Sequence, residues 1–480
     1  MDSALQFLTL LCRVAAALAV GAGIVWVYRD VRRASRTLGL ILACGLLLRI
    51  GLGLTLFWIA ERHAPILQWL RTPDGYWTFA LDAAVYLQEA SVTAGSGHVA
   101  IPAGFSPDYI VWLTAWMLMF GTSAATAPFF NLTLFALVFW LIVKTAGPVG
   151  RDREDLPQIV MAGSFAFSPA LLIHGSQALK DDLCAALIAV SCVGARYLFS
   201  HQPDGNSGPR RQAIGLLTML IAGYLLFGPR DYTVGLIGGA ALLAAASPWA
   251  YRASTWRTLA LRAGAVLVVA IGAGAGLWSG AAGDGVAARV ESGRQLAVSS
   301  GAKALRLPDK LRHSFHKTGG NTNLAPGPVP ARGSAVTVLT WPERARALAT
   351  GIGAIFIPMT VLQATGAVDL GMGPGLRVAT DVDTLFLDAS ILASLVLLVK
   401  RRAAARWHLR YVCFVLALGI ATTGLMAYVV TNFGTLFRLR IMLAVPIWML
   451  GLAVSREVQP EMPDVRRVRH TAFTNILERT

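Results

Sequence analysis

A run in the first third of the chain brings together residues that could act on a proton. Asp82, Tyr86, Glu89 and Ala90 fall near one face of a helix, and Asp74 precedes them in the same run. This spacing places a carboxylate just beyond an apolar segment. A carboxylate can accept a proton. The alternative is an amphipathic helix on a membrane surface, whose acidic residues only face water.

Four basic residues stand at turns between apolar runs, where they could bind an anion: Lys180, Arg230, Arg438 and Arg440. Arginine offers a planar, permanently charged fork that suits phosphate oxygens. Asp181 and Asp182 follow Lys180 and begin a predicted helix, where carboxylates complement the N-terminal dipole. Adjacent carboxylates repel each other and capping needs only one, which favours a functional role. The alternative is structural pairing of the arginines with Asp181, Asp182 or Asp231.

The composition places these residues in a membrane protein. The chain has 480 residues, of which 55% are hydrophobic and only 14% are charged, and this excludes a water-soluble globule. Nine apolar runs are long enough to cross a hydrocarbon core about 30 Å thick. They lie near 5 to 27, 37 to 59, 127 to 144, 158 to 175, 182 to 199, 260 to 279, 384 to 399, 410 to 430 and 436 to 454.

Two shorter runs, 213 to 227 and 232 to 247, are joined by Gly228-Pro229-Arg230-Asp231. This linker breaks helix geometry and carries charge, so we predict a tight hairpin of two crossings. The prediction is therefore an all-α, polytopic membrane protein with about 11 transmembrane helices. Two further stretches, 109 to 120 and 349 to 362, are too short or too interrupted to cross, and we expect both to be interfacial or re-entrant.

The basic residues orient these spans. If the two interfacial stretches do not cross the membrane, 23 of the 42 Lys and Arg residues fall on one side of it. By the positive-inside rule that side is cytoplasmic. Lys180, Arg230, Arg438 and Arg440 then lie on the outer side, against the rule, so orientation does not explain them.

Five segments follow from this map. They are an N-terminal transmembrane helix with a basic cytoplasmic loop (1–36), a transmembrane module (37–280) with a first outer loop (60–126), a large outer loop with a re-entrant segment (281–383), C-terminal transmembrane helices (384–454) and a cytoplasmic tail (455–480). The five cysteines lie in apolar runs and are expected to be buried thiols. His313 and His316 form a weak metal signal without a partner Cys or carboxylate pair, so we predict no metal site.

Several motifs, taken in order, resemble the GT-C superfamily of polytopic glycosyltransferases, such as the protein O-mannosyltransferases and the aminoarabinose transferases. Asp82, Tyr86 and Ala90 reproduce an Asp-x-x-x-Tyr-x-x-x-Ala motif, with Ala83 where many members have Glu. The apolar stretch from Tyr109 to Gly121 resembles the family's juxtamembrane helix. The turn from Ser176 to Asp181, with Gln177 where Arg is common, and Arg438-Leu439-Arg440 followed by Pro446 are similar to later motifs of the family.

The resemblance implies transfer of a sugar from a polyprenyl-phosphate donor to a glycan, lipid or protein acceptor at the outer, periplasmic face of a bacterial inner membrane. Asp82 would be the general base, with Tyr86 and Asp74 supporting it. Lys180, Arg230, Arg438 and Arg440 would bind the donor phosphate, with Asp181 and Asp182 supporting them. A single displacement with one base would invert the anomeric carbon.

We expect no cofactor and no nucleic-acid partner, and the sequence leaves a divalent cation open. An O-antigen polymerase or ligase is the alternative, because such enzymes resemble this chain in having a long basic outer loop with Arg and His. A lipid or solute transporter is a further alternative, although it would place charges at the midplane on broken helices.

Overall fold

The computed structural model describes residues 2–71, 77–96, 106–146, 156–199, 209–246, 312, 324, 339–368, 373–402 and 408–454. Within these residues every regular element is a helix, and one isolated bridge joins Arg71 to Trp77. The α-helices are α1 (Asp2–Ala34), α2 (Arg36–Glu61), α3 (Leu81–Ser96), α4 (Pro107–Phe120), α5 (Thr126–Ala146), α6 (Leu156–Phe167), α7 (Pro169–Gly175), α8 (Asp181–Phe199), α9 (Pro209–Ala246), α14 (Trp341–Phe356), α15 (Met359–Ala364), α16 (Pro374–Lys400), α18 (Leu409–Val429) and α19 (Phe433–Val454). Two short 3-10 helices, Gln68–Leu70 and Thr78–Ala80, precede α3.

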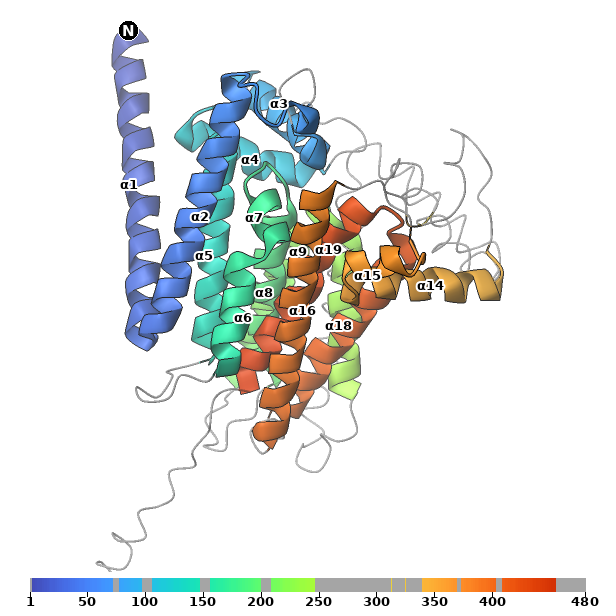
Figure 1. Cartoon of the computed structure of the whole chain (residues 1–480). Helices are drawn as coiled ribbons and strands as arrows, with labels where there is room; N and C mark the ends of the chain where they lie inside the picture. Colours follow the sequence, from blue (N-terminus) through green and yellow to red (C-terminus); the bar gives the residue numbers. More distant parts are fainter. Residues whose placement is uncertain are drawn as a thin grey trace, which may run out of the picture.

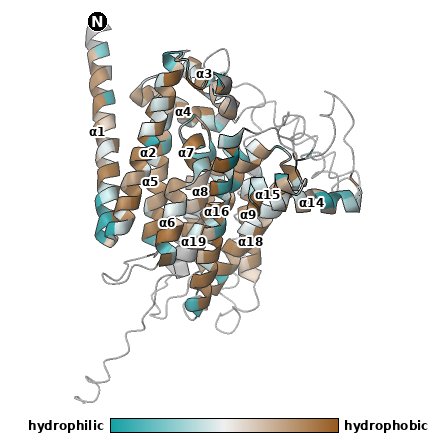
Figure 2. Cartoon of the chain, viewed as in Figure 1, coloured by the Kyte–Doolittle hydropathy of each residue, from teal (hydrophilic) through white to brown (hydrophobic). Residues whose placement is uncertain are grey.

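Eight segments of the described chain are long and apolar enough to cross a membrane, which confirms a polytopic, all-α membrane protein. They correspond to eight of the nine long runs, and Figure 2 shows apolar residues along their lengths with hydrophilic residues near several ends. The ninth run, 260 to 279, lies outside the described residues. The count of about 11 crossings is therefore not confirmed.

The helix α9 is two helices joined at a sharp bend. Arg230 has a non-helical backbone (φ −157°, ψ 79°) and follows Pro229, which cannot donate to the helix ladder. A Cβ added to Gly223 would lie 3.9 Å from Val234 Cγ1. In a straight helix two residues so far apart in sequence would be separated by about 16 Å. The second arm therefore folds back on the first, as the predicted hairpin requires, and its apolar part, Tyr232–Ala246, is shorter than the eight spans.

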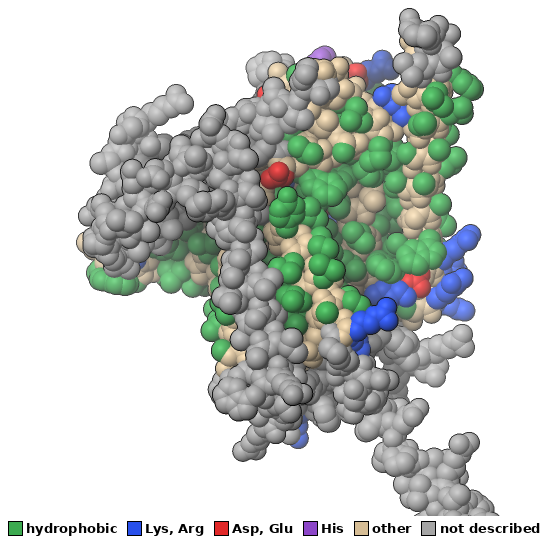
Figure 3. All heavy atoms as spheres, turned by 180° about the vertical axis from the view of Figure 1, so that it is seen from behind, with side chains coloured by type: hydrophobic (Ala, Val, Ile, Leu, Met, Phe, Trp, Pro, Cys, Tyr) green, Lys and Arg blue, Asp and Glu red, His purple; other side chains and the backbone are tan. Residues whose placement is uncertain are grey.

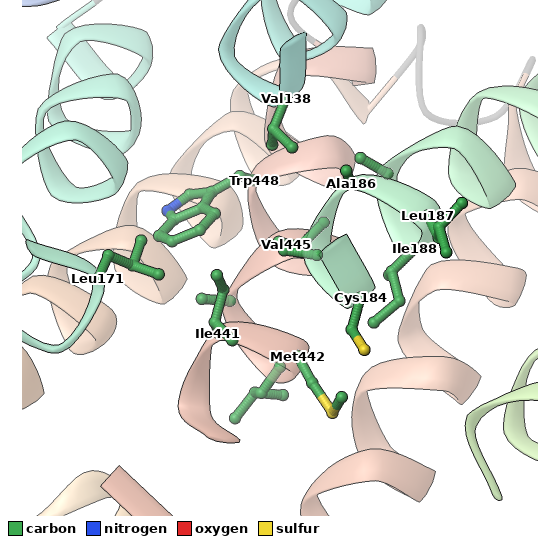
Figure 4. Close-up of a cluster of buried hydrophobic side chains, with 14 of the residues drawn as sticks. Val138, Leu171, Cys184, Ala186, Leu187, Ile188, Ile441, Met442, Val445 and Trp448 are labelled. Atoms are coloured by element: carbon green, nitrogen blue, oxygen red, sulfur yellow. The ribbon is translucent and has the colours of Figure 1, made fainter. Parts of the chain in front are cut away.

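The bundle core forms where α5, α7, α8 and α19 meet. Figure 4 shows a cluster of buried side chains from these helices, including Val138, Leu171, Cys184 and Trp448. Beside it, α8 and α9 approach so closely that a Cβ on Gly194 would lie 2.7 Å from the carbonyl oxygen of Gly215. Small residues at this crossing let the two backbones pack directly, as membrane helices often do.

The helices α3 and α4 lie across the end of the bundle at which α2 ends (Figure 1). We call this the predicted outer end. The helix α4 has 14 residues and rises about 21 Å, too little to cross the hydrocarbon core. At the same end Ser168 caps α7, with Pro169 at its first position, so the segment from α6 to α7 bends at the Ser-Pro pair.

The expected re-entrant stretch 349 to 362 is divided between α14 and α15, with Pro358 between them. A Cβ on Gly351 would overlap the carbonyl oxygen of Ala427, so α14 packs directly against the last turn of α18 and extends sideways from the bundle (Figure 1). The helix α16 begins at Pro374, ten residues before the predicted span at 384, because Pro at the first position starts the helix inside the expected outer loop.

Candidate functional site

Four chain segments meet at the predicted outer end and bring charged residues together. The first turn of α3 supplies Asp82, the turn before α8 supplies Lys180 and Asp181, the bend of α9 supplies Arg230, and α19 supplies Arg438. Each of these residues lies at or near a helix terminus. Because termini are where the chain reverses, residues far apart in sequence can converge there.

Arg438 links the two carboxylates of this group. Its Nη1 atom donates to Asp82 Oδ2 at 3.0 Å, and its Nε atom lies 3.1 Å from Asp181 Oδ2. Arg230 Nη2 donates to the other oxygen of Asp181 at 2.5 Å, and Arg230 Nη1 donates to the hydroxyl of Tyr232 at 2.7 Å. We call Asp82, Lys180, Asp181, Arg230 and Arg438 the ion network.

The ion network is buried on one side and open on the other. The side chains of Arg230 and Asp181 are each 6% exposed, that of Arg438 is 14% exposed and that of Asp82 is 45% exposed. Among the described residues, the Nε atom of Arg230 is buried and has no hydrogen-bond partner, whereas Arg438 Nε has its ion pair with Asp181. A buried donor left unpaired is costly, so an added acceptor beside Arg230 would be favourable.

Lys180 approaches the same site through Ser106, whose hydroxyl oxygen accepts a hydrogen bond from Nζ. Burial, together with the positive charge of Arg230, lowers the pKa of Lys180 to about 8. Tyr86 also bonds Ser106, and its ring packs edge-on against Tyr109 with centroids 5.0 Å apart. Burial, reinforced by the nearby charge of Asp82, raises the pKa of Tyr86 to about 12, so this hydroxyl stays protonated. Sequence reasoning missed Ser106, because a serine just before a helix is expected to cap that helix, and nothing in the sequence indicates its contact with Lys180.

Two of the expected site residues lie elsewhere. Arg440 is two positions beyond Arg438 and therefore points to the opposite face of α19, where its Nη1 lies 3.5 Å from Asp383 and donates to Thr384 at 2.8 Å. Asp182 turns away from Asp181 and packs against Gly175, within electrostatic reach of the buried Arg49. The carboxylates of Asp181 and Asp182 thus point towards different helices, although the two residues are adjacent in sequence.

Asp383 also accepts a hydrogen bond of 2.5 Å from Ser168, so the Arg440 pair joins α16 and α19 to the start of α7. Asp74, His313 and His316 lie outside the described residues. Among the residues that the structure describes, no three His, Cys, Asp or Glu side chains form a group that could hold a metal.

An open cleft of about 360 Å³ lies beside the turn that leads to Lys180, and none of the five ion-network residues lines it. Its wall includes Ser176, Gln177 and Ala178 from the turn that precedes Lys180, together with Glu61 and His63 from the end of α2. Below it, a second hollow of about 120 Å³ between α2 and α5 shares Gly53, Phe57 and Pro128 with the cleft and is otherwise mostly apolar. Sequence reasoning did not select Glu61 or His63, because only the packing of α2 against α5 and the turn after α7 places them beside the site.

No family model, no curated protein and no solved structure matches the chain.

Proposed function

We propose that the protein is a membrane glycosyltransferase that moves a sugar from a polyprenyl-phosphate donor to an acceptor at the outer face of the membrane. The observation that carries this proposal is the position of Arg438, which holds the exposed carboxylate of Asp82 on one side and the buried pair of Asp181 and Arg230 on the other. A base candidate and a set of cations are thereby adjacent, as phosphate departure and hydroxyl attack require.

In this proposal the donor phosphate binds Arg438, Arg230 and Lys180. The ion network has three cations and two carboxylates, so a bound anion would be favourable there. When the bond between the anomeric carbon and the phosphate oxygen breaks, the phosphate keeps the bonding electrons and its negative charge grows. Cations already in place stabilise that charge more in the transition state than in the ground state.

Phosphate binding would also prepare the base. Asp82 and the phosphate compete for the guanidinium of Arg438. A bound phosphate therefore weakens the hydrogen bond between Arg438 and Asp82. The released carboxylate can then accept the proton of the acceptor hydroxyl as that oxygen attacks the anomeric carbon. The side chain of Asp82 is 45% exposed, so an acceptor hydroxyl can approach it from the outer side.

The hollow between α2 and α5 supports a lipid-linked donor. Its lining is apolar apart from Arg49 and includes Ile50, Leu54, Phe129 and Leu132, and it shares three lining residues with the cleft. An isoprenoid chain could lie in this hollow while its phosphate reaches the outer end of the bundle. A soluble nucleotide sugar would have no use for such a surface.

The test is transfer from a defined polyprenyl-phosphate sugar by the purified protein in nanodiscs. We expect transfer by the wild type and a fall of about 10²-fold or more in Asp82→Asn, the range seen when a general base is lost. Full turnover in Asp82→Asn would refute the base assignment. Absence of transfer from every polyprenyl donor, by a protein that unfolds cooperatively, would refute the enzyme proposal.

A further inference from the structure

The opposite end of the bundle carries a basic hollow that the proposed reaction does not use. The turn between α1 and α2 places Arg29, Arg32, Arg33 and Arg36 around an open hollow of about 670 Å³, which Val25 and Tyr28 also line. Figure 3 shows Lys and Arg side chains gathered at this end of α1, next to the apolar flank of the bundle. We call these four arginines the α1–α2 arginine cluster.

Local structure brings the four side chains together. Val25, Tyr28, Arg29 and Arg32 recur at helical spacing along one face of α1. The hydroxyl of Ser35 then caps α2 by accepting from the N–H of Leu38, so the chain reverses within one residue. Gly39 completes the turn, because a Cβ there would lie 2.8 Å from the Cβ of Arg32.

The part of the chain that the structure describes does not fully neutralise this cluster. All four arginines are exposed, and none forms an ion pair with a described carboxylate. Arg33 lies within electrostatic reach of Asp30, and Arg32 Nη1 donates to the hydroxyl of Tyr28 at 3.4 Å. The nearest acid in sequence, Asp30, is occupied elsewhere: its Oδ2 lies 2.7 Å from Lys144 Nζ and accepts from Trp140 Nε1 at 2.8 Å. Asp30 thus links α1 to α5. The four arginines are therefore available to bind an external anion.

The surface beside the cluster is apolar. Val25 and Trp26 on α1 are 47% and 55% exposed, and Leu40 on α2 is 64% exposed. A guanidinium cluster that borders an apolar helix surface matches a phospholipid, whose phosphate and acyl chains are joined in one molecule. A soluble phosphate would gain nothing from the apolar surface.

We propose that the α1–α2 arginine cluster is a binding site for an anionic phospholipid of the membrane leaflet on that side. The guanidinium forks hold the headgroup phosphate, and the chains lie along the exposed faces of α1 and α2. Four arginines exceed what one phosphate can engage, so a lipid with two phosphates, diphosphatidylglycerol, binds more tightly than phosphatidylglycerol. This site is independent of the proposed transfer reaction.

The experiment measures lipid binding to the full-length, delipidated protein in detergent by native mass spectrometry. Diphosphatidylglycerol, phosphatidylglycerol and phosphatidylcholine are compared, with inorganic pyrophosphate as a soluble competitor. We expect diphosphatidylglycerol to bind at least about tenfold more tightly than phosphatidylcholine, and millimolar pyrophosphate not to displace it. Equal binding of all three lipids, or displacement by pyrophosphate, would overturn the proposal.

Two matched variants separate a built site from general charge. Arg32→Gln/Arg33→Gln should weaken diphosphatidylglycerol binding about tenfold or more. Arg401→Gln/Arg402→Gln removes the same charge at the C-terminal end of α16, at the same end of the bundle, and should leave binding unchanged. Equal losses in both variants would contradict a specific site. If the first variant does not fold, Arg32→Lys/Arg33→Lys decides: it keeps the charge but loses the fork, so binding unchanged from wild type would refute the role of the guanidinium.

Discussion

Arg438 Nη1 donates to Asp82 at 3.0 Å while Arg438 Nε lies 3.1 Å from Asp181, so one guanidinium connects the exposed carboxylate of α3 to the buried pair behind it. This relationship makes Arg438 the residue through which a bound anion would influence Asp82. It also explains why neither carboxylate is left alone at the membrane surface.

Replacing Arg438 should impair transfer more than binding. Arg438→Gln should lower kcat by about 10² to 10³, because it removes a cation positioned for the departing phosphate. Arg438→Lys should recover only part of this loss, since an ammonium lacks the planar fork whose separate N–H groups point to Asp82 and Asp181. The measurement is steady-state transfer in nanodiscs. Arg377→Gln, which removes an exposed cation from the start of α16, serves as control and should stay near the wild-type rate.

Breaking the buried pair of Arg230 and Asp181 should destabilise the fold. Arg230→Gln should cost about 3 to 5 kcal/mol, because it leaves the carboxylate of Asp181 buried with one partner fewer. The double variant Arg230→Gln/Asp181→Asn should cost less than the two single changes together. Unfolding in detergent measures all three. Strict additivity would show that the two side chains do not act as a pair.

The lowered pKa of Lys180 predicts a pH dependence. Its folded pKa of about 8 lies below the unfolded value, so between about pH 8 and 10 the unfolded chain binds more protons and stability rises with pH. Activity should change in the opposite direction. Transfer should fall as pH rises through about 8, because Lys180 loses the charge that binds phosphate. Arg stays protonated, so Lys180→Arg should flatten this alkaline limb, and an unchanged pH profile would exclude Lys180 from phosphate binding.

The close crossing of α8 and α9 should not tolerate a methyl group. Gly215→Ala would place Cβ 2.6 Å from the carbonyl oxygen of Gly194, so the backbones must separate at a cost of about 1 to 3 kcal/mol. Gly239→Ala, on the second arm of α9, meets no atom within 4 Å and should be neutral or slightly stabilising. Thermal unfolding of the two variants gives the comparison, and equal midpoints would contradict the packing described.

The fold-back of α9 can be tested by cross-linking. Gly223→Cys and Val234→Cys should form a disulfide on mild oxidation, because the two side chains meet across the hairpin. Proteolytic mapping distinguishes this bond from any formed by the five native cysteines. Gly223→Cys paired with Gly239→Cys is the control and should not cross-link. Failure of the first pair would favour a straight helix through Arg230.

The sequence alone determined the membrane class and most of the spans. Apolar runs of sufficient length leave few options in a bilayer, since every backbone group must be bonded within a helix. The same reasoning located the bend at Arg230, because Pro229 and adjacent charges cannot continue a buried helix. It also selected Lys180, Arg230 and Arg438, because basic residues at outer turns oppose the positive-inside rule, and it selected Asp82 and Asp181 from their spacing and neighbours in the sequence.

Only the tertiary structure decided which of these residues meet. Arg440 and Arg438 look equivalent in sequence, yet the helical repeat sends them to opposite faces of α19, and Arg440 pairs with Asp383 instead. Asp181 and Asp182 are divided in the same way between the ion network and the side that faces Gly175. The contact of Ser106 with Lys180 and the position of Glu61 in the cleft likewise depend on how α2, α4 and α8 pack. Hydropathy and charge are properties of each chain segment, so they can be read from the sequence. Which residues contact each other depends on how the helices rotate and cross, and this is set by side-chain packing across the whole bundle.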